Sequence, residues 1–441
     1  MDFLKNSTIT FLTRIFVFIC AIIISIYIAR ILGPEAKGIY SLLIQMISIS
    51  VVIGMCGIDN AIVYYLSKNE DLKKVYTNLL FYTLLSGAII LFLLFFSVGF
   101  LKASFLRNID DILIKIAILI IPFMLFTKLS ISVVLGLNEI KLFNVFKIMS
   151  SVMTTISFFF LVIILKWDIK GVIFCILLTE LFMSACYIYV ISRKIRIEIN
   201  FDIDFIKKLF GYGIRGFLGS LFLMLIFRID FYLLNMFSDM RDVGIYSVSV
   251  GFGEMIFFIP EAIGVILFPK LSGMNSEDRN KKTIQMLRFF SLTLGIMTLF
   301  MFLFSHELIV FIYGIQYASS VPLTRIMLPG FFFMSFYYLY FSYFFSRGKP
   351  QIVTAVLLIT AIIKTILSLI LISKFGAVGA SFGTLITYST CSLIFMLAFL
   401  KHSGEKLRST FIITIFDMKY IFKSLELAII KTVSLKNRIL F

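Results

Sequence analysis

The chain has 441 residues, of which 60% are hydrophobic and 15% are charged, and its mean hydropathy is +1.04. Soluble domains are about half apolar and about a quarter charged, so this composition excludes an ordinary soluble protein and indicates an integral membrane protein. The net charge of +17 does not require a nucleic-acid partner, because a multi-pass membrane protein concentrates basic residues on its cytoplasmic side.

Apolar runs follow one another along almost the whole chain, and a helix needs about 20 such residues to cross the membrane. The first run begins near Thr8 and is followed too directly by others to be a cleaved signal. The runs and their breaks predict an all-α protein with twelve transmembrane helices, at 8–31, 39–66, 76–101, 112–137, 142–165, 171–192, 211–237, 243–269, 287–305, 322–346, 351–373 and 376–400.

A turn with charged neighbours separates the first two predicted helices. It reads A-R-I-L-G-P-E-A-K-G-I-Y-S over residues 29–41, where Gly33-Pro34 is a turn signal and Arg30, Glu35 and Lys37 indicate contact with water. The tetrapeptide G-I-Y-S returns at 244–247, 206 residues later. Other features repeat at nearly the same distance: Pro122 with Pro329, and Lys166–Gly171 with Lys374–Gly379.

These repeats predict two similar halves in tandem, a common plan for membrane transporters. The expected domains are an N-terminal six-helix lobe at 1–192, a cytoplasmic linker at 193–210, a C-terminal six-helix lobe at 211–401 and a tail at 402–441. The linker reads as an extended or helical segment on the inner membrane surface. The basic tail carries too many charges to cross the membrane and is predicted to be an interfacial amphipathic helix.

The distribution of positive charge predicts the orientation. With the N-terminus inside, the inner segments hold 25 Lys and Arg residues and the outer loops hold nine. Both termini are therefore expected in the cytoplasm.

Seven basic residues remain within the predicted helices, and these are the candidate binding residues of a cationic central cavity: Arg14, Lys128, Lys147, Arg215, Arg228, Arg325 and Lys364. A charge inside the membrane is costly unless it is paired or hydrated, so these side chains are expected to face the bundle interior. The excess of cations suits an anionic group such as phosphate. For Arg14, Lys147 and Arg215 the alternative is that they extend to the nearby cytoplasmic surface.

Five acidic residues also lie within the predicted helices: Asp59, Glu180, Asp230, Glu254 and Glu261. All but Glu180 are candidates for ion coupling or charge pairing. Arg228 and Asp230 are two apart and should point to different faces of one helix, whereas Glu254 and Glu261 are seven apart and should share a face. A purely structural Arg228–Glu254 pair remains an alternative, as does a simple helix-end role for Asp59.

Three prolines lie inside predicted helices, at Pro122, Pro260 and Pro329. Each removes a backbone hydrogen bond, so each is a candidate kink or hinge. The sequence contains no Walker phosphate loop, no catalytic constellation and no metal-ligand spacing, so we expect a protein that is not an enzyme and has no cofactor.

The 29–41 segment resembles the first-loop signature of bacterial polysaccharide flippases, the Wzx-type branch of the MOP exporter superfamily. Residues 228–254, 259–272 and 369–384 carry the same resemblance. It implies two six-helix lobes around a central cavity that opens alternately to each side of the bacterial inner membrane. The implied cargo is an undecaprenyl-pyrophosphate-linked oligosaccharide repeat unit, flipped from the cytoplasmic to the periplasmic leaflet and passed to a polysaccharide polymerase with its chain-length regulator.

By motif position the resemblance covers two groups of residues: Arg30, Gly33, Pro34 and Glu35 in the first loop, and Asp230, Gly244, Tyr246, Glu254 and Pro260 in the seventh and eighth helices. Coupling to H⁺ or Na⁺ is left open. Three alternative functions also stay open: a lipid II flippase, a drug exporter of the MATE family, and a non-transporting scaffold of a glycan-assembly complex.

Overall fold

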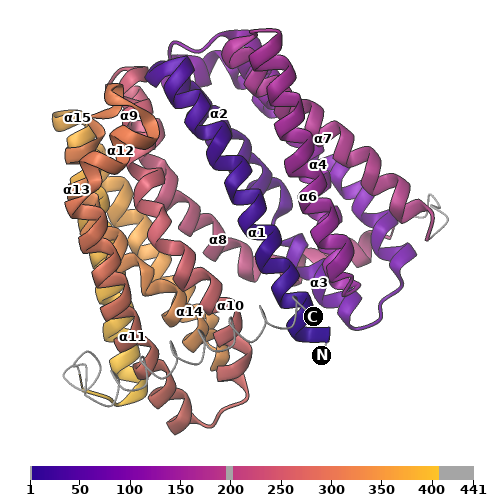
Figure 1. Cartoon of the computed structure of the whole chain (residues 1–441). Coiled ribbons are helices and arrows are strands. Elements are labelled where there is room, and N and C mark those ends of the chain that lie inside the picture. The colour runs from indigo at the N-terminus through magenta and orange to yellow at the C-terminus, as the bar shows by residue number, and fades with distance from the viewer. Residues whose placement is uncertain (1, 195–201, 407–441) are drawn as a thin grey trace, which may run out of the picture. The chain divides into compact units, whose positions relative to one another are not determined.

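The computed structural model describes residues 2–194 and 202–406, and its elements there are helices, as predicted (Figure 1). The first half contains α1 (Asp2–Tyr27), η1 (Ile28–Leu32), α2 (Gly33–Met55), α3 (Ile58–Ser67), α4 (Leu72–Ser104), α5 (Asp111–Gly136), α6 (Ile140–Phe158), η2 (Phe159–Ile164) and α7 (Asp168–Ser192). The second half contains α8 (Ile203–Phe237), α9 (Met240–Glu254), η3 (Met255–Phe257), α10 (Phe258–Ser272), α11 (Ser276–Leu303), α12 (Ser305–Tyr313), η4 (Ile315–Tyr317), α13 (Ser320–Ser335), α14 (Tyr337–Ser346) and α15 (Pro350–Ser403).

Nine stretches of the described chain are long and apolar enough to cross a membrane. Two of them cover more than one predicted span: Ile9–Met55 covers nearly all of 8–31 and the first part of 39–66, and Pro350–Ser403 covers both 351–373 and 376–400. The predicted span at 322–346 corresponds to α13 and α14 together. The helices therefore agree with the predicted all-α membrane protein of about twelve spans.

Several predicted single helices are interrupted, and each interruption has a local cause. Cys56 and Gly57 adopt positive φ angles of 46° and 77°, which ends α2 and turns the chain into α3. The predicted helix 243–269 is divided by the 3₁₀ turn η3, just before Pro260. By contrast, the break that we predicted between the helices 351–373 and 376–400 is present as a kink in α15, where Gly376 has φ of 54°.

The start of the seventh predicted helix is corrected by the structure. We expected it at residue 211, but α8 begins at Ile203, so part of the predicted linker is helical. Asp202 caps this helix by accepting a hydrogen bond from the Phe205 backbone N–H at 2.9 Å. Lys74 lies 2.9 Å from the same carboxylate, and its hydrogen bond lowers the pKa of Asp202.

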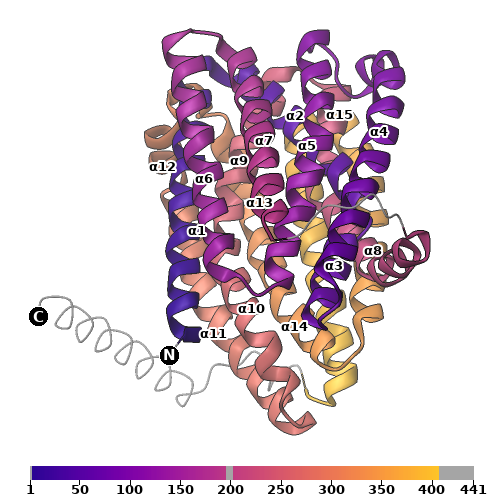
Figure 2. The ribbon, with the colours of Figure 1, turned by 90° about the vertical axis from the view of Figure 1, so that its right-hand side faces the viewer.

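The described chain divides into two compact units, and the first contains residues up to 249 together with 308–320 and 365–380. In this unit α5 packs against α2, α3, α4 and α7, α1 packs against α6, and α8 packs against α2 and α3 (Figure 2). Backbone contact between Gly57 and Gly213 brings α3 and α8 together, because a Cβ on either glycine would overlap with the carbonyl oxygen of the other.

The second unit contains residues 250–307 and 321–364 together with the chain from residue 381. Here α14 packs against α10 and α11. Its core is aromatic: Tyr340 stacks on Phe395 with ring centroids 5.9 Å apart, and Phe331 packs against Phe257 and Tyr388. Burial of such rings is a large apolar contribution to stability.

The division into two six-helix lobes stays a prediction. The middle of the predicted linker, 195–201, and residues 407–441 of the predicted tail 402–441 lie outside the described residues.

Candidate functional site

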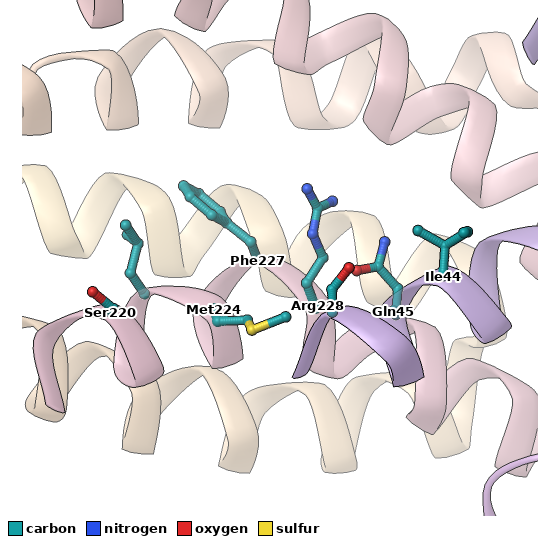
Figure 3. A pocket seen from close by; sticks show the side chains of 8 residues that line it. Ile44, Gln45, Ser220, Met224, Phe227 and Arg228 are labelled. Atoms are coloured by element: carbon teal, nitrogen blue, oxygen red, sulfur yellow. The ribbon is translucent and has the colours of Figure 1, made fainter. Parts of the chain in front are cut away.

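A pocket lies between α2 and α8 in the first unit. Its volume is about 390 Å³, and its walls are Ile44, Gln45, Ser48, Ser220, Leu223, Met224, Phe227 and Arg228. Figure 3 shows the Arg228 guanidinium beside the Gln45 amide, with both side chains extending in the same direction. The pocket thus offers one cation, neutral hydrogen-bonding groups and an apolar surface, a combination typical of small-molecule sites.

Arg228 and Asp230 point to different surroundings, as their spacing predicts. Asp230 is only 2% exposed, and its two oxygens accept hydrogen bonds from the Tyr246 hydroxyl at 2.7 Å and from the Ser368 hydroxyl at 2.6 Å. Asp230 therefore joins α8 to α9 and α15 within the first unit. A buried carboxylate held by hydroxyl donors stabilises this arrangement of helices.

Lys128 and Lys147 line a second, smaller pocket of about 60 Å³ between α5, α6 and α7. Glu180 lines the same pocket and accepts a hydrogen bond from the Thr127 hydroxyl at 2.6 Å. Lys147 interacts electrostatically with Lys128, Glu180 and Arg14. Three of the seven predicted cations are therefore neighbours, and Glu180 partly balances their charge.

This charge balance leads to a testable prediction about stability. Glu180→Ala removes the nearby negative charge and the acceptor of the Thr127 hydroxyl, so the free energy of unfolding should fall by about 2 kcal/mol. Adding Lys147→Met should restore part of the loss, because it removes one of the repelling cations. Denaturant titration in mixed micelles measures both variants, and absence of rescue would show that the hydrogen bond alone matters.

The other predicted cations lie elsewhere. Lys364, in the second unit, is 1% exposed, donates to the Thr384 hydroxyl at 2.8 Å and lies over the Tyr388 ring. Arg325 donates from Nε to the Ser305 hydroxyl at 2.8 Å. The side chain of Arg215 lies outside what the structure describes. The six predicted cations whose side chains the structure describes are thus distributed over several surroundings within the two units.

The remaining predicted acids also have distinct positions. Glu254 and Glu261 both interact electrostatically with Tyr338, which agrees with a shared face. Asp59 lies in the first turn of α3. A carboxylate there is favoured by the helix dipole, and its role, as a helix-end residue or in ion coupling, stays a prediction.

The 29–41 segment is bound to the end of α12. Arg30 donates to the backbone carbonyls of Phe311 and Ile312, the latter at 2.9 Å, and so caps that helix with a positive charge. The Gln316 amide donates in return to the carbonyl of Ala29 at 2.6 Å. Gly33 has φ of 86°, as its turn position predicts, and Pro34 and Glu35 lie in the first turn of α2.

Lys37 is not at the water-exposed position that we predicted for it. Its side chain is 6% exposed, and its ammonium donates to the Ser25 hydroxyl at 2.7 Å. A lysine beside a turn ordinarily indicates solvent. Here the turn packs against other helices, and this packing could not be predicted from the sequence around Lys37.

The two copies of G-I-Y-S meet at their glycines. A Cβ on Gly38 would overlap with the carbonyl oxygen of Met240, and a Cβ on Gly244 would overlap with the carbonyl oxygen of Pro34. Met240 follows Pro34 by the same 206 residues that separate the glycines, so the contact is symmetric with respect to the repeat. Only glycine permits this backbone approach.

The three predicted hinge prolines occupy different helix positions. Pro122 and Pro329 lie inside α5 and α13, whereas Pro260 lies in the first turn of α10, where a missing N–H costs little. Whether any of them acts as a hinge stays a prediction.

Sequence reasoning did not select Gln45, Ser48 and Ser220 of the larger pocket, Gln316 of the α12 contact, or Glu180 as a neighbour of the two lysines. Uncharged polar residues in apolar helices give little signal. For Glu180 the signal was its position inside an apolar run.

Comparison with known proteins identifies the family. Residues 3–275 match the polysaccharide biosynthesis protein family. The chain belongs to this family. Family and fold together indicate a membrane transporter rather than an enzyme, which agrees with the resemblance noted in the first-loop signature.

The individual relatives of this polysaccharide biosynthesis family member share less than 30% of their aligned residues with it. A Shigella flexneri protein described as a proposed O-antigen transporter is 24% identical over 371 residues, which covers 80% of this chain and 87% of that protein. The uncharacterized membrane protein MJ1068 of Methanocaldococcus jannaschii is 29% identical over 228 residues. That match covers 48% of this chain and 44% of the archaeal protein, so it spans less than half of that relative's length.

Solved structures show the same fold. An inward-facing MATE family multidrug resistance transporter of the MOP superfamily superposes with a TM-score of 0.73 at 14% identity, covering 87% of this chain and 94% of that one. A MOP superfamily transporter from Pyrococcus furiosus, whose binding pocket is described as having reverse polarity, gives 0.64 at 12% identity over 91% of this chain and 94% of that one. The chain is therefore a multi-pass membrane protein with the fold of MOP transporters.

Proposed function

We propose that this protein is a flippase that moves undecaprenyl-pyrophosphate-linked oligosaccharide repeat units from the cytoplasmic to the outer leaflet of the bacterial inner membrane. The observation that carries the proposal is the pocket between α2 and α8, where Arg228 provides a positive charge inside an apolar bundle. The family match and the O-antigen description of the Shigella relative support the same substrate class.

The chemistry of the pocket suits the head group of such a lipid. The guanidinium of Arg228 forms strong, directional hydrogen bonds with phosphate oxygens. Gln45, Ser48 and Ser220 offer donors and acceptors for sugar hydroxyls, and Phe227 and Met224 offer apolar surface for the sugar ring. The Lys128–Lys147 pocket is a second position where anionic groups are attracted.

In the proposed mechanism the polyprenyl tail stays in the bilayer beside a lateral opening while the head group crosses through the polar interior. This route keeps the sugars and the pyrophosphate away from hydrocarbon, where their desolvation would be prohibitive. Access then alternates between the two sides by movement of one part of the helical bundle against the other. The basic segments place both termini in the cytoplasm in this proposal.

Arg228→Ala is the variant that tests the proposed site. In proteoliposomes, flipping of a fluorescent undecaprenyl-pyrophosphate oligosaccharide should fall about tenfold or more, because a charge-assisted bond to phosphate contributes at least 1.4 kcal/mol. Lys115→Ala, which removes one positive charge at an exposed position of α5, is the matched control and should keep normal flipping.

The outcomes of this experiment separate the alternatives. Equal flipping by wild type and Arg228→Ala would keep the flippase but reduce Arg228 to a structural role. Absence of flipping by folded wild type with a well-matched sugar would favour MATE-type drug export or a scaffold function. Transfer of lipid II instead of the oligosaccharide would identify a lipid II flippase.

Coupling to an H⁺ or Na⁺ gradient is part of the proposal, with Glu254, Glu261, Asp230 and Asp59 as the candidate acids. Flipping that is unchanged by an imposed ion gradient would overturn it. A polymerase and its chain-length regulator are the proposed partners that receive the flipped product.

A further inference from the structure

We propose that the two G-I-Y-S glycines, together with the Arg30–α12 contact, form a gate that closes the end of the first unit at which α2 and α9 begin. The proposal rests on the transporter fold and not on the identity of the cargo. Its elements are the 29–41 segment, the start of α9 and residues 308–320, all of which belong to the first unit.

The first observation is the glycine contact. Gly38 and Gly244 place the backbone of α2 and the backbone of α9 so close that neither position has space for a Cβ. An arrangement this tight excludes water and ions between the helix ends. The glycines themselves contribute no side chain that must be reordered when the helices separate, so the contact can form and break repeatedly.

The second observation is a set of polar contacts around the glycines. Arg30 donates to two carbonyls at the end of α12, and Gln316 donates to the carbonyls of Ala29 and Arg30 at 2.6 and 3.2 Å. The Ser249 hydroxyl donates to the carbonyl of Ser320 at 3.0 Å. The hydrogen bonds of Arg30 and Gln316 are exposed or half-buried, so water can replace them at low cost when the gate opens, whereas the Ser249–Ser320 hydrogen bond is buried.

The third observation is the position of the pocket. Ile44, Gln45 and Ser48 lie on α2, between about 1.7 and 2.8 turns beyond Gly38. In this proposal the glycine contact therefore closes access along α2 to Arg228. The repeat relation explains why both halves of the chain supply one glycine. Each copy of the motif begins a helix at the same end and presents its glycine to the other copy.

The test measures access to the pocket in a cysteine-free background that carries Gln45→Cys. A membrane-impermeant maleimide is applied from the side on which Glu35→Cys, an exposed residue of the same segment, reacts. Gly244→Ala should increase the labelling rate of Gln45→Cys about tenfold, because the added Cβ prevents closure and shifts the population to the open form. Arg30→Gln should increase it by a smaller factor.

Gly216→Ala is the matched control, since a Cβ at Gly216 meets open space and labelling should stay at the wild-type rate. Unchanged labelling in both folded Gly244→Ala and Arg30→Gln would overturn the gate. Because the readout needs no cargo, this result would leave the flippase proposal intact. Absence of flipping in wild type would likewise leave the labelling result intact.

Discussion

Asp230→Ala should lower the free energy of unfolding by about 3 kcal/mol or more, since hydrogen bonds to a charged group contribute about 1.5–3 kcal/mol each. The carboxylate accepts one bond from Tyr246 of α9 and one from Ser368 of α15. Its removal deprives two buried hydroxyls of this acceptor and leaves a cavity where α8, α9 and α15 meet. The expected change is visible as a lower midpoint in denaturant titration and a lower Tm by circular dichroism.

Asp230→Asn is the control that separates shape from charge. The amide has nearly the same volume and keeps one oxygen acceptor. The free energy of unfolding should therefore fall by less than half as much in Asp230→Asn as in Asp230→Ala. If the two variants were equally unstable, the negative charge itself would be the stabilising feature. If neither were destabilised, the hydrogen bonds to Tyr246 and Ser368 would contribute nothing to stability. An Asp230→Asn variant that folds but no longer responds to an ion gradient would instead support Asp230 as the coupling acid.

Gly379→Ala should destabilise the protein by about 3 kcal/mol, at the upper end of the range for forced insertion into a packed site. The kink at Gly376 turns α15 so sharply that a Cβ at Gly379 would overlap with the backbone carbonyl oxygen of Leu371. Backbone cannot rotate away as a side chain can, so the kink itself must relax. The Tm of the purified variant measures the effect.

Gly99→Ala and Gly216→Ala are the controls for this prediction, because both positions are helical and face open space. Alanine has a higher helix propensity than glycine by about 1 kcal/mol, so these variants should be as stable as wild type or more stable. A Gly379→Ala variant that matched them would show that the close contact at the kink is not required. Destabilisation of all three variants would indicate that the helices do not tolerate glycine-to-alanine substitution in general.

Much of the fold could be predicted from the sequence because the membrane imposes strong constraints on it. Long apolar runs must be helices, since hydrocarbon offers no partner for an unpaired backbone group. The helix interruptions were harder to predict. Cys56 has no turn signal of its own, yet it adopts a positive φ directly before Gly57, which is in close contact with Gly213.

The candidate site was predicted only in part. Charges in apolar helices are conspicuous, so Arg228, Lys128 and Lys147 were selected, and the structure places all three in pockets. Which of them are neighbours could not be predicted, because helix periodicity determines the face of one helix but not the helix that it meets. Nothing in the sequence distinguishes Gln45 and Ser48 from other polar residues, and only the structure shows that they line the same pocket as Arg228.

The sequence by itself determined the membrane environment, the helical class, the repeat of 206 residues and the resemblance that agrees with the family. These properties depend on composition and on spacing along the chain, and they need no knowledge of packing. Only the tertiary structure decided that Lys37 is buried against Ser25, that Glu180 lies beside two lysines, and that Gly38 meets Gly244. These contacts form between helices that are packed together in the fold, and the local sequence pattern of one helix does not determine which other helix it packs against.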